Sequence, residues 1–326
     1  HISRLQAQGD RTQLRNDHFR KEPAMPKPHR THPCPLRPGH PATIISASDA
    51  GNYIVTAQKK LYETAPRVHC LTNPVAMNDT ANILLAVGGS AIMAECTAEA
   101  AEITAICHAT LLNTGIPSDD KFAACILAGK RANELGHPVV LDPVGVGAGT
   151  YRQNNIRKLL LHVSPSLIRC NLEEALTLLS FAPDRDGSPG GAATRQIPHG
   201  GVESGMDADL DARADTAARL AGTYRTTVLL SGRADAVSDG SLTTLVTGGD
   251  ARAARITGSG CMLSAICAAL LPAAPNAYQA ALYASVFWKQ AAFTAGQKTD
   301  ARAAGLGSFR MYLFDAATNP ESMHSR

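Results

Sequence analysis

From about residue 44 onward, short apolar runs alternate with longer stretches in which apolar residues recur every three or four positions. The short runs predict strands, and the longer stretches predict amphipathic helices. The clearest strand is Pro138–Asp142, and four further runs have strand character: Arg67–Leu71, Ala109–Asn113, Leu167–Cys170 and Thr226–Ser231. Strands that alternate with helices of crossover length predict an α/β fold, with a mostly parallel central sheet covered by helices on both faces.

The predicted helices lie between and after these strands. The helix over 118–135 has the strongest boundary signals, because Ser118 can cap its start, two aspartates follow in its first turn, and Gly136 ends it. The other predicted helices span 75–87, 154–162, 171–179, 209–223, 258–271, 276–295 and 308–317. Two short apolar runs, Ala236–Asp239 and Thr243–Val246, flank a turn that contains glycine. They predict a late antiparallel hairpin at one edge of the sheet.

Two stretches of the chain lack this alternation. Residues 1–43 contain seven prolines and carry eight Lys or Arg against three Asp or Glu, a composition typical of disorder. We expect a disordered basic tail at 1–43, one domain over 44–320, and a disordered C-terminus at 321–326. The tail is either an upstream extension of the reading frame or a transit peptide, although its acidic residues weaken the second interpretation. Residues 182–205 are rich in glycine and proline and predict a surface loop.

Charge and cysteine usage exclude several kinds of protein. Beyond residue 43 the chain carries 23 Lys or Arg against 25 Asp or Glu, and the net charge of the whole chain is +3. Nucleic-acid binding is not expected, because it needs clustered basic residues. No apolar run is long enough to cross a bilayer, so no membrane role is expected. The eight cysteines form no CxxC pairs and mostly lie in apolar segments, which predicts reduced thiols in a cytoplasmic protein without zinc.

Candidate chemistry lies where the predicted strands end, because ligands of such sheets bind beyond the carboxyl ends of the strands. Asp142 ends the clearest strand and precedes a segment with three glycines, which would let a ligand approach the backbone. A carboxylate there is suited to a metal ion or to a reacting hydroxyl. Alternatively, Asp142 only shapes the turn before Pro143. Arg169 lies at the end of the next strand and could bind a phosphate through a charge-assisted, bidentate contact.

The predicted helix after Arg169 begins with Asn171 and carries Glu174 one turn further on. Glu174 could hold Mg²⁺ through water. The alternative is a capping box, in which the Asn171 side chain caps the helix and Glu174 closes the box. The spacing favours the capping box, and both roles can coexist.

The segment Thr257–Ser264 places two glycines directly before a long apolar helix. Unpaired N–H groups at such a helix start, with the positive end of the helix dipole, would form an anion hole for a phosphoryl group in transfer. The donors would come from Gly258, Ser259, Gly260 and Cys261. The alternative is a tight turn without a ligand. Cys261 lies in the first turn, a position that would lower its thiol pKa, but the residue taken alone favours a buried structural cysteine.

These segments occur in the same order as in hydroxyethylthiazole kinases, and the chain resembles that family of ribokinase-like kinases. The matching segments are HCLTNPVAMNDTANILLAVGGSAIMAE (69–95), LLNTG (111–115), AGKRANELGHPVVLDPVGVGAGTYR (128–152), IRCNLEEA (168–175), LSGRADAVSDG (230–240), ITGSGCMLSA (256–265) and GSFRMYLFDA (307–316). The resemblance covers roughly residues 53–317.

The resemblance implies transfer of the γ-phosphoryl group of ATP, with Mg²⁺, to the primary hydroxyl of 4-methyl-5-(2-hydroxyethyl)thiazole in thiamine biosynthesis. It also implies a homotrimer with sites between subunits. By position, it assigns Met93, Gly258 and Asn73 to the thiazole, Arg169, Ser231 and Asn171 to ATP, Asp142 and Glu174 to Mg²⁺, and Cys261 to the place where other ribokinase-like kinases carry an aspartate base. Because a phosphoryl acceptor loses its proton late in transfer, we expect Cys261 to contribute only modestly to turnover.

The chain departs from the family pattern at three places: Arg233, where an acidic or small residue is usual, Pro74, where another residue is common, and the long 182–205 loop. Arg233 could change the affinity for the nucleotide, and Pro74 could change the shape of the thiazole pocket. One alternative function is a pyrimidine-alcohol kinase or a nucleotide-repair dehydratase, but those relatives usually carry Gly-x-Gly-Asp where this chain has Cys261. Another is a non-catalytic sensor that binds thiazole or nucleotide without forming ADP.

Overall fold

The computed structural model of the protein describes residues 42–181 and 206–318. The predicted 182–205 loop, the predicted C-terminus at 321–326, and all but the last two residues of the predicted tail lie outside the described residues. Within these two ranges, no helix is long and apolar enough to cross a membrane.

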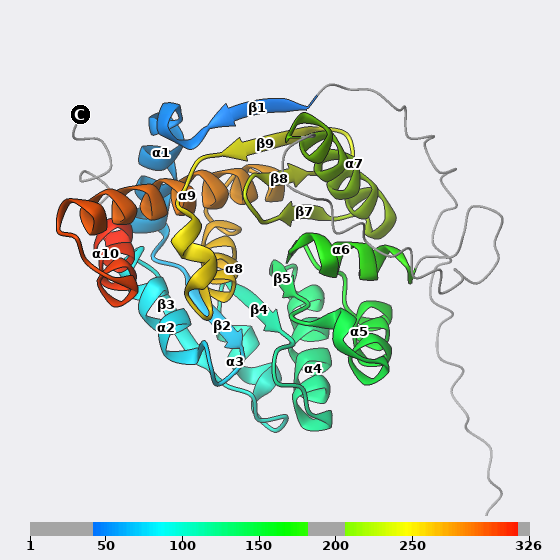
Figure 1. The fold of residues 1–326 in the computed structure, drawn as a ribbon. Helices are drawn as coiled ribbons and strands as arrows, with labels where there is room; N and C mark the ends of the chain where they lie inside the picture. The colour runs from blue at the N-terminus through cyan, green and yellow to red at the C-terminus, as the bar shows by residue number, and fades with distance from the viewer. Residues whose placement is uncertain (1–41, 182–205, 319–326) are drawn as a thin grey trace, which may run out of the picture. The chain divides into compact units, whose positions relative to one another are not determined.

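A nine-stranded sheet lies at the centre of the domain, in the order β1-β9-β8-β7-β6-β5-β4-β2-β3 (Figure 1). The strands are β1 Thr43–Ser46, β2 Arg67–Leu71, β3 Ser90–Met93, β4 Ala109–Asn113, β5 Val139–Asp142, β6 Leu167–Cys170, β7 Thr227–Leu230, β8 Asp235–Ser238 and β9 Thr243–Thr247. Every neighbouring pair is parallel except the two pairs that β8 makes with β7 and β9. The mostly parallel sheet and the late hairpin are therefore confirmed. The hairpin, however, lies one strand in from the edge, because β1 pairs outside β9.

Ten α-helices are seen in the described residues: α1 Gly51–Thr64, α2 Met77–Ala86, α3 Ala100–Ile106, α4 Asp119–Leu135, α5 Thr150–His162, α6 Leu172–Leu179, α7 Met206–Tyr224, α8 Ser259–Leu270, α9 Ala277–Ala301 and α10 Leu306–Thr318. The boundary signals of α4 are confirmed, since Ser118 Oγ accepts the N–H of Lys121 and Gly136 adopts a left-handed φ of 70°. Helix α9 ends six residues later than predicted, and α5 begins four residues earlier.

The helices form a layer on each face of the sheet. Helices α1, α2, α8, α9 and α10 share one hydrophobic core with the sheet, and α3 to α7 share the other. Successive side chains of a strand point to opposite faces of the sheet. Leu111 and Leu112 of β4 therefore belong to different cores. Helix α8 is buried from Cys261 to Leu270, which explains why its sequence is apolar on all sides.

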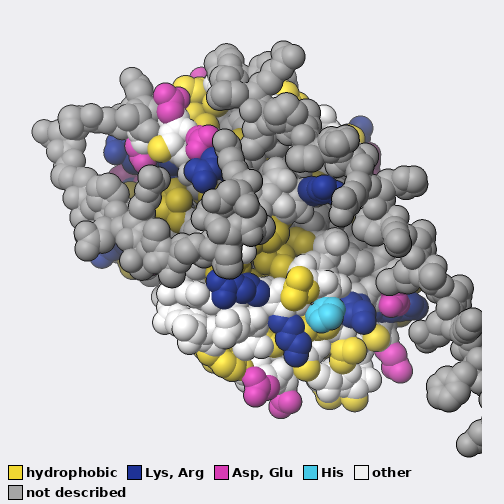
Figure 2. All heavy atoms as spheres, turned by 90° about the vertical axis from the view of Figure 1, so that its right-hand side faces the viewer, with side chains coloured by type: hydrophobic (Ala, Val, Ile, Leu, Met, Phe, Trp, Pro, Cys, Tyr) yellow, Lys and Arg dark blue, Asp and Glu magenta, His cyan; other side chains and the backbone are white. Residues whose placement is uncertain are grey.

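The surface that Figure 2 shows, the right-hand side of Figure 1, carries both signs of charge. Lys and Arg side chains lie there among Asp, Glu and apolar side chains.

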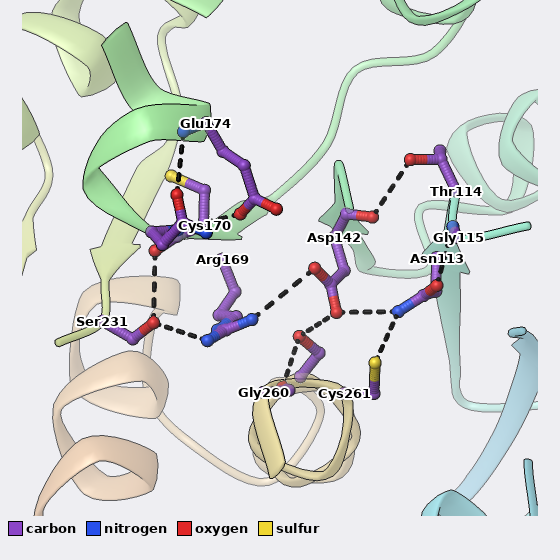
Figure 3. A network of polar contacts seen from close by, with 12 residues as sticks. Asn113, Thr114, Gly115, Asp142, Arg169, Cys170, Glu174, Ser231, Gly260 and Cys261 are labelled. Carbon is purple, nitrogen blue, oxygen red and sulfur yellow. Dashed lines mark hydrogen bonds and ion pairs between the residues drawn. The ribbon is translucent and has the colours of Figure 1, made fainter. Parts of the chain in front are cut away.

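The polar cluster of Figure 3 lies at the carboxyl ends of the parallel strands. Strands β2, β4, β5, β6 and β7 all end on that side of the sheet.

Candidate active site

Asp142, the last residue of β5, is fully buried at the centre of a polar cluster (Figure 3). Its Oδ2 accepts hydrogen bonds of 2.8 Å from Ser264 Oγ and from Asn113 Nδ2. Its Oδ1 accepts no hydrogen bond and lies 3.7 Å from Arg169 Nη1. Burial raises the pKa of the Asp142 carboxyl to about 6, although the Arg169 guanidinium acts in the opposite direction. Asp142 is therefore a carboxylate near neutral pH with one oxygen left for a ligand.

Arg169, on β6, connects Asp142 with the end of β7. It forms the ion pair with Asp142 and donates a hydrogen bond from Nη2 to Ser231 Oγ. Its guanidinium lies against Gly260 in the first turn of α8, where an added Cβ would be only 2.4 Å from Nη1. Any side chain at position 260 would therefore displace the Arg169 guanidinium.

The start of α8 faces this cluster without a side-chain cap. Its N-cap residue, Gly258, has a left-handed φ of 83°, which favours glycine. The N–H of Ser259 donates to Ile256 O, so one of the four predicted anion-hole donors has a partner within the chain. We expect the amides of Gly260 and Cys261 to be the main donors toward an anion, because the first N–H groups of a helix have no intrahelical partner.

The prediction of a lowered pKa for the Cys261 thiol is wrong. Burial raises the pKa to about 11, and the negative charge of Asp142 adds to the increase. Hydrogen bonds from Asn113 and Asn73 and the charge of Arg169 act in the opposite direction but are weaker. Cys261 is 7% exposed, so the loss of solvation outweighs the favourable position at a helix start. The side chain is a neutral thiol in the ligand-free protein.

Asn113, the last residue of β4, is a site residue that sequence reasoning missed. Its Nδ2 donates to Asp142 Oδ2 and, over 3.2 Å, to Cys261 Sγ. Its Oδ1 accepts 3.0 Å hydrogen bonds from Asn73 Nδ2 and from the Gly115 N–H. Both amide hydrogens and both acceptor positions are in use, so this side chain is fixed in one orientation. The available signal was its position at the end of a predicted strand, as for Asp142.

The structure brings Asn73 and Gly258 to one side of Cys261. Asn73 Nδ2 donates to Cys261 Sγ over 3.5 Å, and Asn73 Oδ1 accepts the N–H of Ala76. An added Cβ on Gly258 would lie 3.0 Å from Ala76 Cβ, so the loop after β2 contacts the start of α8. Met93, the other residue assigned to the thiazole, ends β3 and is half-buried, opposite Cys70 of the neighbouring β2.

Lys121, in the first turn of α4, is a second residue that sequence reasoning missed. Its side chain is 4% exposed, and its Nζ donates to Thr72 O and Gly115 O and pairs with Glu95 Oε1 at 3.1 Å. These partners lie in the loops that follow β2, β4 and β3, respectively. One buried ammonium therefore holds together the three loops around Asn73.

The capping box at the start of α6 is confirmed. Asn171 Oδ1 accepts the N–H of Glu174, and Glu174 Oε2 accepts the N–H of Asn171. Glu174 Oε1 accepts a 3.0 Å hydrogen bond from the N–H of Gly145, in the glycine segment after Asp142. Glu174 is thus buried beside that segment, and its negative charge acts on Asp142.

The described residues contain no cluster of three or more His, Cys, Asp or Glu that could enclose a metal ion. Mg²⁺ does not need such a cluster, because it commonly binds one or two carboxylates and completes its coordination with water and phosphate oxygens. The free Oδ1 of Asp142 and the nearby Glu174 carboxylate are hard oxygen donors and fit this requirement.

The sheet order and the position of this cluster place the chain among the α/β kinases. A solved structure of hydroxyethylthiazole kinase from Pyrococcus horikoshii OT3 has the same fold, with a TM-score of 0.70 and 29% identity over 84% of this chain and 97% of that chain. A sequence model of the hydroxyethylthiazole kinase family matches residues 58–320. Hydroxyethylthiazole kinases from Alkaliphilus oremlandii and Haemophilus influenzae are 36% and 40% identical over 271 residues, which are 82% of this chain and 93% and 95% of theirs. The chain therefore belongs to the hydroxyethylthiazole kinase family, as its motifs predict.

Proposed function

We propose that the chain transfers the γ-phosphoryl group of ATP to the primary hydroxyl of 4-methyl-5-(2-hydroxyethyl)thiazole, in the thiazole branch of thiamine biosynthesis. Family membership supports the reaction. The observation that carries the proposal for this chain is the cluster of Asp142, Arg169 and Cys261 at the uncapped start of α8. A migrating phosphoryl group spreads negative charge over its oxygens, and fixed donors at that helix start would stabilise it.

The two substrates would approach from different strand ends. The nucleotide phosphates would lie by Arg169 and Ser231, whose side chains are hydrogen-bonded at the ends of β6 and β7. The acceptor would lie by Asn73, Met93 and Gly258. In this arrangement the acceptor hydroxyl would lie beside Cys261, between the two substrate regions.

Asp142 and Glu174 would hold Mg²⁺, mostly through water. When bound, Mg²⁺ neutralises charge on the phosphate oxygens. Asp142 is the carboxylate with an oxygen that accepts no hydrogen bond, whereas both Glu174 oxygens already accept main-chain N–H groups. We infer that Asp142 makes the stronger contribution to metal binding.

Cys261 would orient the acceptor hydroxyl and not act as a strong base. Its sulfur accepts N–H groups from Asn113 and Asn73, so the S–H hydrogen is left to point elsewhere. A raised thiol pKa disfavours proton removal by Cys261 before transfer. A loose transition state does not require early deprotonation, and the anion-binding donors would then supply most of the rate acceleration.

A coupled assay of ADP release tests the proposal, with Mg-ATP and the thiazole alcohol as substrates. ADP formation with the thiazole alcohol, and much less with hydroxymethylpyrimidine, is the expected result. Binding of the thiazole alcohol without ADP formation would instead support a non-catalytic sensor. We also propose a homotrimer in the cytoplasm with sites shared between subunits, and light scattering on the purified protein would test the number of subunits.

A further inference from the structure

The turn between β7 and β8, residues 231–234, is held by two buried cations. Arg213 comes from α7 and Lys289 from α9, and these residues are only 7% and 6% exposed. The two helices belong to the layers on opposite faces of the sheet (Figure 1). The turn is therefore fixed from both sides.

Arg213 binds the two ends of the turn. Its Nη2 donates to Ser231 O at 3.0 Å, and its Nε donates to Ala234 O at 2.9 Å. An added Cβ on Gly232 would lie only 2.2 Å from Nη2, so the guanidinium fills the space that a side chain would need.

Lys289 binds the middle of the turn. Its Nζ donates to Gly232 O and to Arg233 O, both at 3.1 Å, and pairs with Asp235 Oδ1 at 3.2 Å. Asp235 Oδ1 also accepts the N–H of Gly232, and Asp235 Oδ2 accepts Ser285 Oγ. With the two bonds from Arg213, all four carbonyl groups of the turn accept hydrogen bonds from buried cations.

Cationic side chains also lie at this turn. Ser231 Oγ is hydrogen-bonded to the Arg169 guanidinium, and the Arg233 side chain is exposed. Cationic side chains beside a turn that is already fixed suit phosphate groups.

We propose that Arg213 and Lys289 are positioning residues for nucleotide binding: they hold the 231–234 turn in the conformation that receives the phosphates of ATP. The identity of the nucleotide rests on the proposed function. A turn that is ordered before binding loses little further conformational freedom when the nucleotide arrives, which strengthens affinity. Neither residue is expected to contact the acceptor.

Calorimetric titration of Mg-ATP into the full chain, without acceptor, tests the inference. Lys289→Met and Arg213→Gln are each expected to raise the Kd for Mg-ATP by about tenfold. The matched control is Lys121→Met, which removes an equally buried lysine that also donates to main-chain carbonyls but on the acceptor side. Its Kd for Mg-ATP should stay within about twofold of the native value.

A second variant separates positioning from simple loss of stability. Lys289→Met leaves Asp235 as an uncompensated buried charge, which destabilises the fold. In Lys289→Met/Asp235→Asn the charge is gone, and the amide oxygen of the substituted side chain can still accept the Gly232 N–H. Urea unfolding should show recovered stability, whereas the Kd for Mg-ATP should remain raised because Gly232 O and Arg233 O still lack their donor.

Three results would overturn the inference: native affinity in Lys289→Met, affinity that returns together with stability in the double variant, or an equal loss in Lys121→Met. Because no thiazole is present, these results are independent of the acceptor. Failure of the native protein to bind Mg-ATP would contradict the proposed function as well.

Discussion

The raised pKa of Asp142 makes a quantitative prediction about stability. In the folded protein the pKa of this carboxyl is about 6, against a reference value of 3.8. Between these two values the folded state binds more protons than the unfolded state, so the free energy of unfolding falls as pH rises. Each unit of pKa difference corresponds to about 1.4 kcal/mol, which gives a loss of about 3 kcal/mol by pH 7 and no further change above it.

Asp142→Asn isolates this contribution, because the asparagine does not titrate. The free energy of unfolding of the variant minus that of the native protein should increase by about 2.4 kcal/mol between pH 4 and pH 7, because the rest of the change falls below pH 4. Urea unfolding of both proteins without ligands, at half-unit pH intervals, measures this difference. Titrating groups that do not interact with Asp142 cancel in the subtraction, and any constant offset between the proteins does not affect the result.

Asp215→Asn provides a matched control on α7, since the side chain of Asp215 is 66% exposed. A difference for Asp142→Asn that stays constant with pH would show that burial does not raise this pKa. A difference that decreases as pH rises would show that the charge of Arg169 outweighs burial, which would contradict our account of the site.

Three further predictions concern turnover in the ADP-release assay. Asn113→Ala should lower kcat by about 10- to 100-fold, because Asp142 and Cys261 each lose a hydrogen bond that fixes their position. A variant with native kcat would exclude this positioning role. Cys261→Ala should lower kcat by no more than about tenfold, and Cys261→Asp should remain active; complete loss of turnover in Cys261→Ala, with ATP binding intact, would show that the thiol is essential. Lys121→Met should raise the KM for the thiazole alcohol by about tenfold and leave the KM for ATP unchanged, and an equal rise in both would indicate a general loss of structure.

The parts of the fold that could be predicted from sequence are those with local signals. Helix α4 has a cap, first-turn acids and a terminal glycine, and β5 is a short continuous apolar run. Sequence reasoning missed helices α1 and α3, and a missing side-chain cap does not distinguish them, because the predicted helices α2 and α8 lack one too. Strand β1 has four residues and is stabilised by pairing with β9, some 200 residues later in the chain, which no local pattern can reveal.

The same distinction holds for the site. Asp142, Arg169 and the glycine-led start of α8 could be predicted because each is marked by its position at the end of an element. Asn113 acts through partners 29 and 148 residues away, so its role became visible only in three dimensions. The prediction for the thiol pKa of Cys261 is wrong because a helix start is a local feature, whereas burial depends on the whole fold.

Gly260 has a consequence that reaches beyond its own backbone. Even one methyl group at this position would push the guanidinium of Arg169 away from both Ser231 and Asp142. The nucleotide region and the metal region that we propose would then both lose the cation that they share. We therefore expect this position to tolerate no substitution in an active enzyme, although the residue itself has no reactive group.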